Sequence, residues 1–332
     1  MVALSTVWTH FLPPKPKFTD SNVPDLSGKV YIVTGANTGI GKELAQLLYS
    51  KNAKVYIAAR SQEKSDKAIN DIKKAVPNST GSLVFWALDL SDLDNVKAAA
   101  QSFLAQEHHL HVLFNNAGVM VGPVEPPLKT AQGHELAIGV NCVGTFLFTR
   151  LLSPLLVETA KAAPANTVRV VWLSSFGMEL TAVPDIGIST ENLDYHVPVA
   201  ATDRYGISKT GVWALATEYA RRYKNDGIVS VPLNPGNLHT ELPRDQGFAV
   251  RLVAWLVCYP AIRGAYSELF AAFSPELAID KADWSKSWVG PFGRVLPLRA
   301  DLSNATIPEV EGGTGGTAKF WDWNAKQVEK YL

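Results

Sequence analysis

Short apolar runs alternate with amphipathic stretches through residues 29–233. The runs are rich in Val, Ile and Leu with few polar interruptions, which is typical of strands covered on both faces of a parallel sheet. The stretches between them repeat apolar residues at helical spacing. This alternation predicts an α/β fold with a single Rossmann-type, doubly wound parallel sheet and helices on both faces. The predicted strands are 29–34, 54–59, 83–88, 112–114, 168–175 and 228–233, and the predicted helices are 42–50, 62–76, 93–106, 133–159 and 205–224.

The chain before the first predicted strand differs in character. Residues 1–28 contain aromatic side chains and three closely spaced prolines, Pro13, Pro14 and Pro16. Because proline removes a backbone donor and clashes with the preceding helical turn, we expect an N-terminal arm without a helix. Its aromatic side chains should pack against the domain that follows.

No repeat, charge run or low-complexity linker divides residues 29–332, so we expect a single domain. Two segments interrupt or follow the alternation of strands and helices. Residues 176–203 are predicted to form an insertion on the substrate side, and residues 240–285 are predicted to form a substrate lid. Residues 286–332 should form a C-terminal tail that docks on the domain.

The insertion and the segment after residue 240 are both rich in apolar residues. Beside an active cleft they would line an apolar pocket for a bulky hydrophobic ketone or alcohol, such as a terpenoid, polyketide or retinoid-like secondary metabolite. Other interpretations remain open. The segments could instead cover an edge of the sheet or form a subunit interface, and residues 248–260 could contact a membrane surface.

Charge and composition exclude several classes of partner. The 332 residues carry 31 basic and 31 acidic side chains, with a pI near 7.1, so we expect no nucleic-acid partner. The two cysteines, Cys142 and Cys258, are far apart in apolar surroundings and should be reduced thiols. No spacing typical of a metal site is present, and we expect none. Without a signal-peptide pattern or an apolar run long enough to span a bilayer, we expect no integral membrane segment and a cytoplasmic location.

A glycine-rich motif follows the first predicted strand. The strand leads into Gly35-Ala-Asn-Thr-Gly-Ile-Gly41, and a helical pattern begins directly after it. Glycines in such a strand–turn–helix let the backbone approach a pyrophosphate that binds the free N–H groups of the helix start. Because doubly wound sheets bind ligands at the carboxyl ends of their strands, the motif predicts a dinucleotide site there.

Tyr205 and Lys209 are four residues apart on a predicted helix and should therefore lie on the same face. A phenol needs its pKa of about 10 lowered to act as a base at neutral pH. An ammonium about 4 Å away supplies roughly 4 kcal/mol toward this at an effective dielectric of about 20. The pair predicts a tyrosine that exchanges a proton with a carbonyl or alcohol oxygen.

Taken together and in this order, the motifs of the chain resemble those of the short-chain dehydrogenase/reductase family. They are Thr34-Gly-x-x-x-Gly-x-Gly41, Asn115-Asn-Ala-Gly118, Ser175, Tyr205-x-x-x-Lys209 and Pro235-Gly236, and the resemblance covers residues 26–240. The chain is most similar to the retinol-dehydrogenase-like branch and its fungal members. Compact members have a much shorter interval between the serine and the tyrosine, which here is 205 − 175 = 30 residues.

The resemblance implies roles for four residues. Tyr205 would donate a proton in reduction and accept one in oxidation, while Lys209 would lower the pKa of Tyr205 and hold the nicotinamide ribose. Ser175 would hydrogen-bond the substrate oxygen, and Asn141 would hold a water that relays protons from Lys209. Ser174 competes with Ser175, because strand alternation would let only one of them face the cleft. Asn141 has the alternative of bonding only backbone groups.

The resemblance also implies a set of cofactor contacts. A basic residue after the second strand accommodates the 2′-phosphate of NADP(H), whereas an acidic residue would select NAD(H). Arg60 stands at this position with Lys64 one helical turn further on, so we predict NADP(H); the alternative is a solvated arginine on a loop. The predicted cofactor-binding residues are Gly35, Thr38, Gly39, Ile40, Gly41, Arg60, Lys64, Asp89, Asn116, Tyr205, Lys209 and Thr240.

We therefore expect an NADP(H)-dependent oxidoreductase that interconverts a ketone or aldehyde and an alcohol on a bulky hydrophobic substrate. Two alternatives remain open: an epimerase or cyclase that uses bound NADP without net redox change, and a non-catalytic, cofactor-gated interaction protein on the same fold. The intact set of Ser175, Tyr205 and Lys209 favours an enzyme. The resemblance also implies a homodimer formed through helices 133–159 and 205–224.

Overall fold

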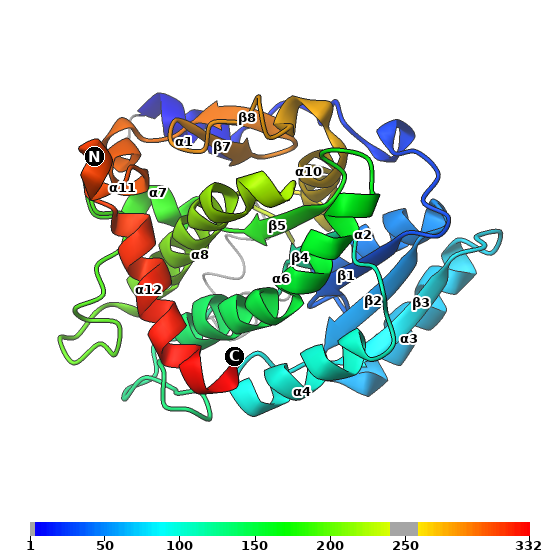
Figure 1. Cartoon of the computed structure of the whole chain (residues 1–332), viewed down its shortest axis with the longest axis horizontal. Coiled ribbons are helices and arrows are strands. Elements are labelled where there is room, and N and C mark those ends of the chain that lie inside the picture. Colours follow the sequence, from blue (N-terminus) through cyan, green and yellow to red (C-terminus); the bar gives the residue numbers. More distant parts are fainter. Residues whose placement is uncertain (1–3, 240–257) are drawn as a thin grey trace.

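An eight-stranded sheet with helices on both faces forms the centre of the molecule (Figure 1). The computed structural model describes residues 4–239 and 258–332. The strands are β1 (Val30–Thr34), β2 (Lys54–Ala59), β3 (Ser82–Ala87), β4 (Val112–Asn115), β5 (Arg169–Leu173), β6 (Val229–Leu233), β7 (Ser287–Gly290) and β8 (Arg294–Pro297). Their order in the sheet is β3-β2-β1-β4-β5-β6-β7-β8.

The first six strands are parallel, as the sequence pattern predicts. Their order reverses between β1 and β4, and this switch point is where doubly wound sheets bind ligands. β7 extends the sheet parallel to β6, and β8 turns back antiparallel to β7. The sequence pattern does not predict these last two strands, because neither is a continuous apolar run: β7 is Ser-Trp-Val-Gly and β8 is Arg-Val-Leu-Pro.

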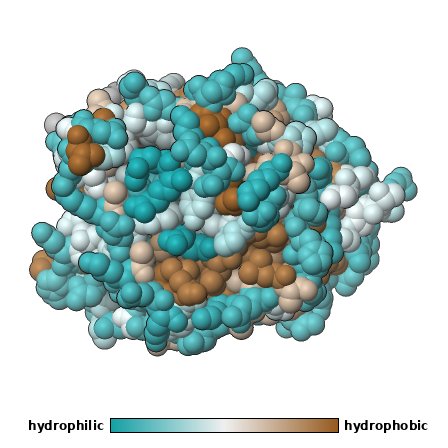
Figure 2. Space-filling view, in the orientation of Figure 1, coloured by the Kyte–Doolittle hydropathy of each residue, from teal (hydrophilic) through white to brown (hydrophobic). Residues whose placement is uncertain are grey.

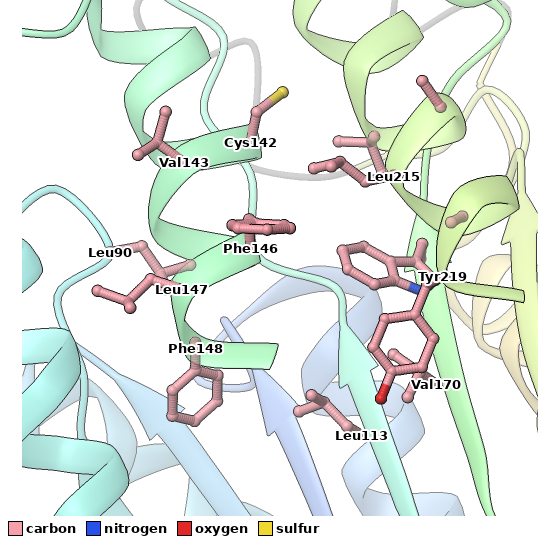
Figure 3. Close-up of a cluster of buried hydrophobic side chains, with 14 of the residues drawn as sticks. Leu90, Leu113, Cys142, Val143, Phe146, Leu147, Phe148, Val170, Leu215 and Tyr219 are labelled. Carbon is pink, nitrogen blue, oxygen red and sulfur yellow. The ribbon is translucent and has the colours of Figure 1, made fainter. Parts of the chain in front are cut away.

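Helices cover both faces of the sheet, which confirms the doubly wound arrangement. They include α2 (Gly39–Ser50), α3 (Gln62–Ala75), α4 (Leu93–Leu104), α6 (Thr145–Ala162), α8 (Ala201–Tyr223) and α10 (Ala261–Phe273). Apolar residues of α2, α3 and α10 form one buried cluster with the sheet, and those of α4, α6 and α8 form another. In the second cluster, Phe146 and Phe148 of α6 and Leu215 of α8 pack with Leu113 and Val170 of the sheet (Figure 3).

The helix predicted at 133–159 spans Leu136–Ala162. It begins with the short α5 (Leu136–Ile138), passes through a π-helical segment at Gly139–Gly144 and continues as α6. This 27-residue helix is long and apolar enough to cross a membrane, but 72% of its apolar window is buried inside the protein. It is therefore a helix of the protein core.

The expectation that the N-terminal arm contains no helix is wrong. Leu4–Phe11 form helix α1, which ends before Pro13, so the prolines limit the helix instead of preventing it. The arm packs on the domain through two of its rings. The ring centroid of His10 lies 5.1 Å from that of Phe176, and Phe11 meets Phe176 edge-on at 5.3 Å.

The insertion 176–203 begins with the short helix α7 (Gly177–Thr181) and continues mainly as turns. Its apolar residues line a small cavity together with Ile207 of α8. Ile207 comes two residues after Tyr205 and so lies about 200° around the helix from it. This cavity therefore lies on another side of α8 than Tyr205, and the apolar pocket beside the active cleft stays a prediction.

Only part of the predicted lid, 240–285, can be placed, because residues 240–257 lie outside the described residues. Residues 261–273 form α10, which packs against α2 and against β5 and β6. Ala265, Leu269 and Ala272 recur at helical spacing along α10 and are buried. This part of the segment therefore belongs to the layered core and not to a lid.

Beyond β8, the tail contains α11 (Ser303–Thr306) and α12 (Gly316–Val328), and α12 lies along α8 (Figure 1). Helix α12 thus covers part of the surface of α8, and pairing of a second copy through the two long helices stays a prediction. Helix α6 keeps partly exposed apolar residues, Leu151 and Leu155. Figure 2 shows an apolar area over this helix, bordered by hydrophilic residues.

Candidate active site

The residues singled out in the sequence gather at the carboxyl ends of β1, β4 and β5, beside the switch point of the sheet. The turn 35–41 follows β1, residues 116–119 follow β4, and Ser175 follows β5. The first turns of α8 add Tyr205 and Lys209 to this edge. Hydrogen bonds between these segments, described below, join them into one site.

The glycine turn and the start of α2 form a cradle for an anionic group. Gly35 and Gly39 have φ angles of 67° and 56°, in the left-handed region that favours glycine. A Cβ atom on Gly41 would lie 2.6 Å from Nδ2 of Asn116 and 2.8 Å from the carbonyl oxygen of Gly35, so a larger residue does not fit. The N-cap residue Thr38 makes no side-chain capping bond, which leaves N–H groups of the first helical turn for a pyrophosphate. These residues therefore fit a dinucleotide.

Asn116 holds the glycine turn against the end of β4. Its Nδ2 donates to the carbonyl oxygen of Thr34 at 2.6 Å. The hydroxyl of Thr34 donates to the carbonyl oxygen of Phe114 at 3.1 Å and accepts from the N–H of Ala117 at 2.9 Å. These bonds give Asn116 a bracing position, and its contact with a cofactor ribose stays a prediction.

The side chain of Ser175 lies near enough to the Tyr205 phenol to influence its pKa. Ser175 is half-buried, and its Oγ accepts from the N–H of Gly177 at 3.2 Å. Burial raises the pKa of Tyr205 to about 12, and the side chain of Ser175 opposes this rise. The phenol is therefore protonated at neutral pH and able to donate its proton.

Lys209 is buried, and its Nζ donates to the carbonyl oxygen of Leu173 at 2.7 Å. The Nζ lies 5.8 Å from the centre of the Tyr205 ring. Burial lowers the pKa of Lys209 to about 8, against a smaller opposing effect of Cys142. Desolvation disfavours the charged forms of both groups and is the largest cause of both pKa shifts. That the ammonium of Lys209 lowers the pKa of Tyr205 stays a prediction.

Ser174 and Ser175 have different surroundings. Strand β5 ends at Leu173, earlier than the predicted end at residue 175, so both serines lie beyond the strand. Ser174 is buried, and its Oγ donates to the carbonyl oxygen of Lys209 at 2.7 Å. This bond ties the end of β5 to α8 and leaves Ser175 as the serine beside Tyr205.

Asn141 lies in the π-helical segment and connects the loop after β4 to α8. Its Nδ2 donates to the carbonyl oxygen of Val119 at 3.0 Å and to Oγ of Ser208 at 2.9 Å. Its Oδ1 accepts from the N–H of Val119 at 2.8 Å. A Cβ atom on Gly118 would lie 3.0 Å from Nζ of Lys209 and 3.4 Å from Oδ1 of Asn141, so both side chains approach Gly118. The bonds to Val119 match the alternative of backbone bonding, and a proton relay through Asn141 stays a prediction.

Arg60 and Lys64 lie at the other end of the candidate cofactor site. Arg60 follows β2 directly, Lys64 lies in the first turn of α3, and both are exposed. Neither forms an ion pair with another residue of the part of the chain that the structure describes. Asp89 uses its Oδ1 to accept from the N–H and the hydroxyl of Ser91 at 2.9 and 2.6 Å.

Two predicted cofactor residues remain. Ile40 lies against α10, because a Cβ atom on Gly264 would be 3.3 Å from its side chain. Thr240 lies outside the described residues.

The sequence does not predict the structural role of one further residue of the site, Ser208. Ser208 donates to the carbonyl oxygen of Tyr205 at 2.7 Å and accepts from Asn141. It stands within the Tyr205–Lys209 motif, so its presence near the site is visible in the sequence. Its bond to Asn141 joins positions 67 residues apart, and no local pattern reports such a contact.

A glycine cradle and a serine–tyrosine–lysine set at the switch point of a doubly wound sheet define an α/β protein of the dinucleotide-binding class. A family model described as short chain dehydrogenase matches residues 29–176. A short-chain dehydrogenase/reductase of Neocamarosporium betae is 48% identical over 330 residues, which cover 99% of this chain and 94% of that protein. The chain therefore belongs to the short-chain dehydrogenase/reductase family. Its place in the retinol-dehydrogenase-like branch stays a prediction.

Solved structures share the fold and hold different cofactors. The Pseudomonas aeruginosa RhlG/NADP active-site complex is 26% identical with a TM-score of 0.52, and the match covers 66% of this chain and 77% of that chain. A 3-ketoacyl-(acyl-carrier-protein) reductase from Brucella melitensis complexed with NADH is 23% identical with a TM-score of 0.58, covering 76% of this chain and 93% of that chain. The choice between NADP(H) and NAD(H) must therefore be argued from this chain's own residues.

Proposed function

We propose that the chain is an NADP(H)-dependent oxidoreductase that interconverts a ketone or aldehyde and an alcohol on a bulky hydrophobic substrate. The supporting observation is that Ser175, Tyr205 and buried Lys209 come together at the same sheet edge as the glycine cradle. A bound nicotinamide would supply or accept the hydride. The residues of the chain would hold the substrate oxygen and exchange its proton.

Ser175 and Tyr205 would both donate hydrogen bonds to the substrate oxygen. Because the side chain of Ser175 acts on the Tyr205 phenol, an oxygen bound between the two hydroxyls would meet two donors aimed at developing negative charge. Tyr205 would then give its proton to the oxygen. A phenol whose pKa is about 12 is still far more acidic than an aliphatic alcohol, so this transfer is favourable. Oxidation would instead require the phenolate, whereas reduction uses the protonated phenol that the raised pKa favours at neutral pH.

Lys209 would return a proton to Tyr205 after each turnover. Its pKa of about 8 is close to neutral pH, so both of its protonation states are accessible. Asn141 approaches the same backbone position, Gly118, as the lysine Nζ. We propose that the proton path to solvent runs past Asn141.

The preference for NADP(H) is proposed from the end of β2. Ala58 and Ala59 bring no carboxylate to this position, and Arg60 and Lys64 are exposed cations without an ion pair to another described residue. A guanidinium binds a phosphate through two hydrogen bonds, so Arg60 suits the ribose 2′-phosphate. The test compares kcat/KM for NADPH and NADH in the wild type and in Arg60→Ala. We expect the variant to lose at least about tenfold with NADPH and little with NADH. A wild type that prefers NADH would contradict the assignment.

The reaction is tested by following NADPH oxidation at 340 nm with a panel of hydrophobic ketones, in the wild type and in Tyr205→Phe. We expect one mole of NADPH to be oxidised for each mole of alcohol formed. We also propose that the protein is cytoplasmic. Product formation without NADPH consumption would indicate an epimerase or cyclase. Cofactor binding without turnover of any ketone would indicate an interaction protein on the same fold.

A further inference from the structure

Helix α1 lies on the same edge of the sheet as the candidate active site. His10 is buried, and its Nδ1 lies 3.0 Å from Nδ2 of Asn234, the residue that follows β6. Because the amide nitrogen donates, the ring nitrogen must accept and the imidazole is neutral. Burial, with a smaller contribution from Arg294, lowers the pKa of His10 to about 4, which agrees with this state.

Two backbone contacts fix the end of the helix further. Nη2 of Arg294, in β8, donates to the carbonyl oxygen of Thr9 at 2.9 Å. The hydroxyl of Tyr259 lies 3.4 Å from the carbonyl oxygen of Phe11. Helix α1 is therefore attached to the polypeptide that surrounds the carboxyl ends of β6 and β7.

Phe11 connects this helix to the residue beside Ser175. Its ring meets Phe176 edge-on at 5.3 Å, and Phe176 directly follows Ser175 in the chain. Phe176 is buried, whereas Phe11 is 38% exposed, so part of its ring is open. Phe176 therefore links Ser175, where the substrate oxygen would bind, to the partly open ring of Phe11.

Helix α1 presents an apolar stripe at this place. Trp8 and Leu12 are 68% and 52% exposed, and they follow helical spacing with Phe11, so the three side chains lie on one face. No acidic residue and no lysine or arginine lies within the helix. The match to the family model begins only at residue 29, so this stripe lies outside the segment that the model matches.

We propose that α1 forms the outer wall of the substrate site and that Phe11, with Trp8 beyond it, binds the apolar part of a large substrate. This rests on the proposed function, which places the reacting oxygen at Ser175 and Tyr205. His10 acts as a positioning residue, because it holds the helix and faces Asn234. The continuity from Ser175 through Phe176 to Phe11 is the observation that carries the inference.

The experiment uses the full chain, the variants Phe11→Ala and Phe11→Leu, and two ketones of different size, cyclohexanone and a steroid 3-ketone. Calorimetric titration of each ketone in the presence of NADP measures binding without requiring turnover, and NADPH oxidation measures kcat/KM. Phe11→Ala should weaken steroid-ketone binding and lower kcat/KM about tenfold, and should change cyclohexanone values less than about twofold. Phe11→Leu should recover most of the loss. Val310→Ala, which shortens a 94% exposed side chain elsewhere, is the matched control.

The possible outcomes separate the two proposals. Equal binding of the steroid ketone to the wild type and to Phe11→Ala would contradict the proposal that α1 contributes to the substrate site, whether or not the ketone is reduced. Equal loss for both ketones also overturns it, because the side chain would then act on the reacting centre or on folding. Weakened binding of the steroid ketone without any NADPH oxidation would support the wall and contradict the proposed reaction.

Discussion

Near its start, helix α8 buries Ser208 and Lys209 among polar groups, whereas further along the same helix buries Trp213 and Tyr219 within the apolar core. In the first region burial opposes charge, which is seen in the pKa of Lys209 lowered to about 8. In the second region burial is favourable, and the Tyr219 hydroxyl has a hydrogen-bond partner in Ser153 at 2.9 Å. The contrast indicates that the remainder of the helix supplies the stability that holds the polar end in place.

Helix α12 covers the second region of α8 from outside. Trp321 is buried, packs edge-on against Phe146 with centroids 4.8 Å apart, and lies beneath the guanidinium of Arg222 at 4.8 Å. Phe320 fills the space over Gly211, where a Cβ atom would lie 2.8 Å from its ring. If the two regions are separable, loss of the reacting hydroxyl in the first should lower activity with little change in stability. Loss of packing in the second should lower stability with little change in activity.

The largest expected effect is on activity, at the polar region. Tyr205→Phe removes the proposed proton donor, and we expect kcat/KM for ketone reduction to fall by about 10³-fold, within the usual range for general acid catalysis. The thermal midpoint should change little, because the residue as a whole is half-buried and the substitution removes only its hydroxyl. Assays of NADPH oxidation and thermal unfolding measure both. Tyr223→Phe, near the other end of α8, is the matched control and should keep full activity. A variant that keeps more than about a tenth of the wild-type rate would refute the assignment of Tyr205.

The second prediction concerns stability, at the apolar region. Trp321→Ala should lower the free energy of unfolding by about 3–5 kcal/mol, because it removes a buried aromatic side chain and leaves a cavity. Folded protein should keep kcat/KM within about twofold of the wild type if the regions are separable. Urea unfolding and assays well below the midpoint check both statements. Trp8→Ala, at a 68% exposed position, is the stability control and should change the unfolding free energy little. A large loss of kcat in folded Trp321→Ala would show that α12 also positions Lys209.

The sequence predicts the sheet well where each strand is a continuous apolar run between helices of clear period. The bounds of β2 are predicted without error at 54–59, because an apolar run there is closed on both sides by polar residues. Such runs are absent at β7 and β8, where polar residues, glycine or proline flank only two large hydrophobic side chains, and β8 leaves Val295 exposed. At α1, the prolines mark only the end of the helix. The sequence pattern gives no sign that His10, within this helix, contacts Asn234 after β6.

The candidate site was predictable in membership and not in its electrostatics. Ser175, Tyr205 and Lys209 follow from motif order, and the fold places them together. The direction of the Tyr205 pKa shift depends on how deeply the group is buried, which spacing along a helix does not report. The bridge from Val119 through Asn141 to Ser208 joins three separate segments, so it becomes visible only in the folded chain.

The third prediction uses pH to detect the cost of burying Lys209. Its pKa is about 8 in the folded chain and 10.5 as its ordinary value, so between these values the unfolded chain binds more protons. Stability contributed by this group therefore rises with pH through that window, by at most about 1.4 kcal/mol per pH unit. From pH 8 to pH 10, we expect the unfolding free energy of the wild type to increase relative to that of Lys209→Met by up to about 2 kcal/mol.

Urea unfolding across this pH range is the measurement, and Lys326→Met, at an exposed position on α12, is the control. The window stops at pH 10 because the raised pKa of Tyr205 acts in the opposite direction above it. A pH-independent difference for Lys209→Met would show that the ammonium keeps its water contacts and that the polar region carries no such cost.

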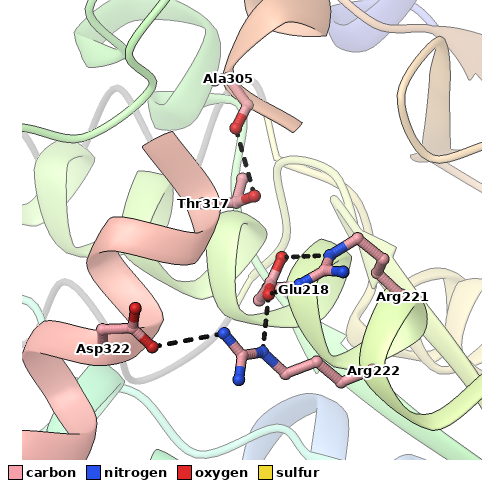
Figure 4. A network of polar contacts seen from close by, with 6 residues as sticks. All are labelled: Glu218, Arg221, Arg222, Ala305, Thr317 and Asp322. Atoms are coloured by element: carbon pink, nitrogen blue, oxygen red, sulfur yellow. Dashed lines mark hydrogen bonds and ion pairs between the residues drawn. The ribbon is translucent and has the colours of Figure 1, made fainter. Parts of the chain in front are cut away.

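The smallest expected effect separates packing from charge at the apolar region. Arg222 contacts two carboxylates, Glu218 within α8 at 2.6 Å and Asp322 of α12 at 3.3 Å (Figure 4). The side chain of Asp322 is 64% exposed, whereas that of Glu218 is 1% exposed and also pairs with Arg221. Because exposed ion pairs contribute little, Asp322→Ala should lower the unfolding free energy by less than about 0.5 kcal/mol.

Glu218→Gln, within the same network, should cost about 3 kcal/mol, because it leaves two guanidinium groups without the charge of their buried partner. Urea unfolding of both variants, at low and high salt, distinguishes the two pairs. If Trp321 and Phe320 hold α12 in place, Asp322→Ala will barely change the unfolding free energy, and added salt will not alter that result. If instead Asp322→Ala approaches the cost of Trp321→Ala, charge rather than aromatic packing fixes α12 to α8, and the apolar region does not provide the stability ascribed to it.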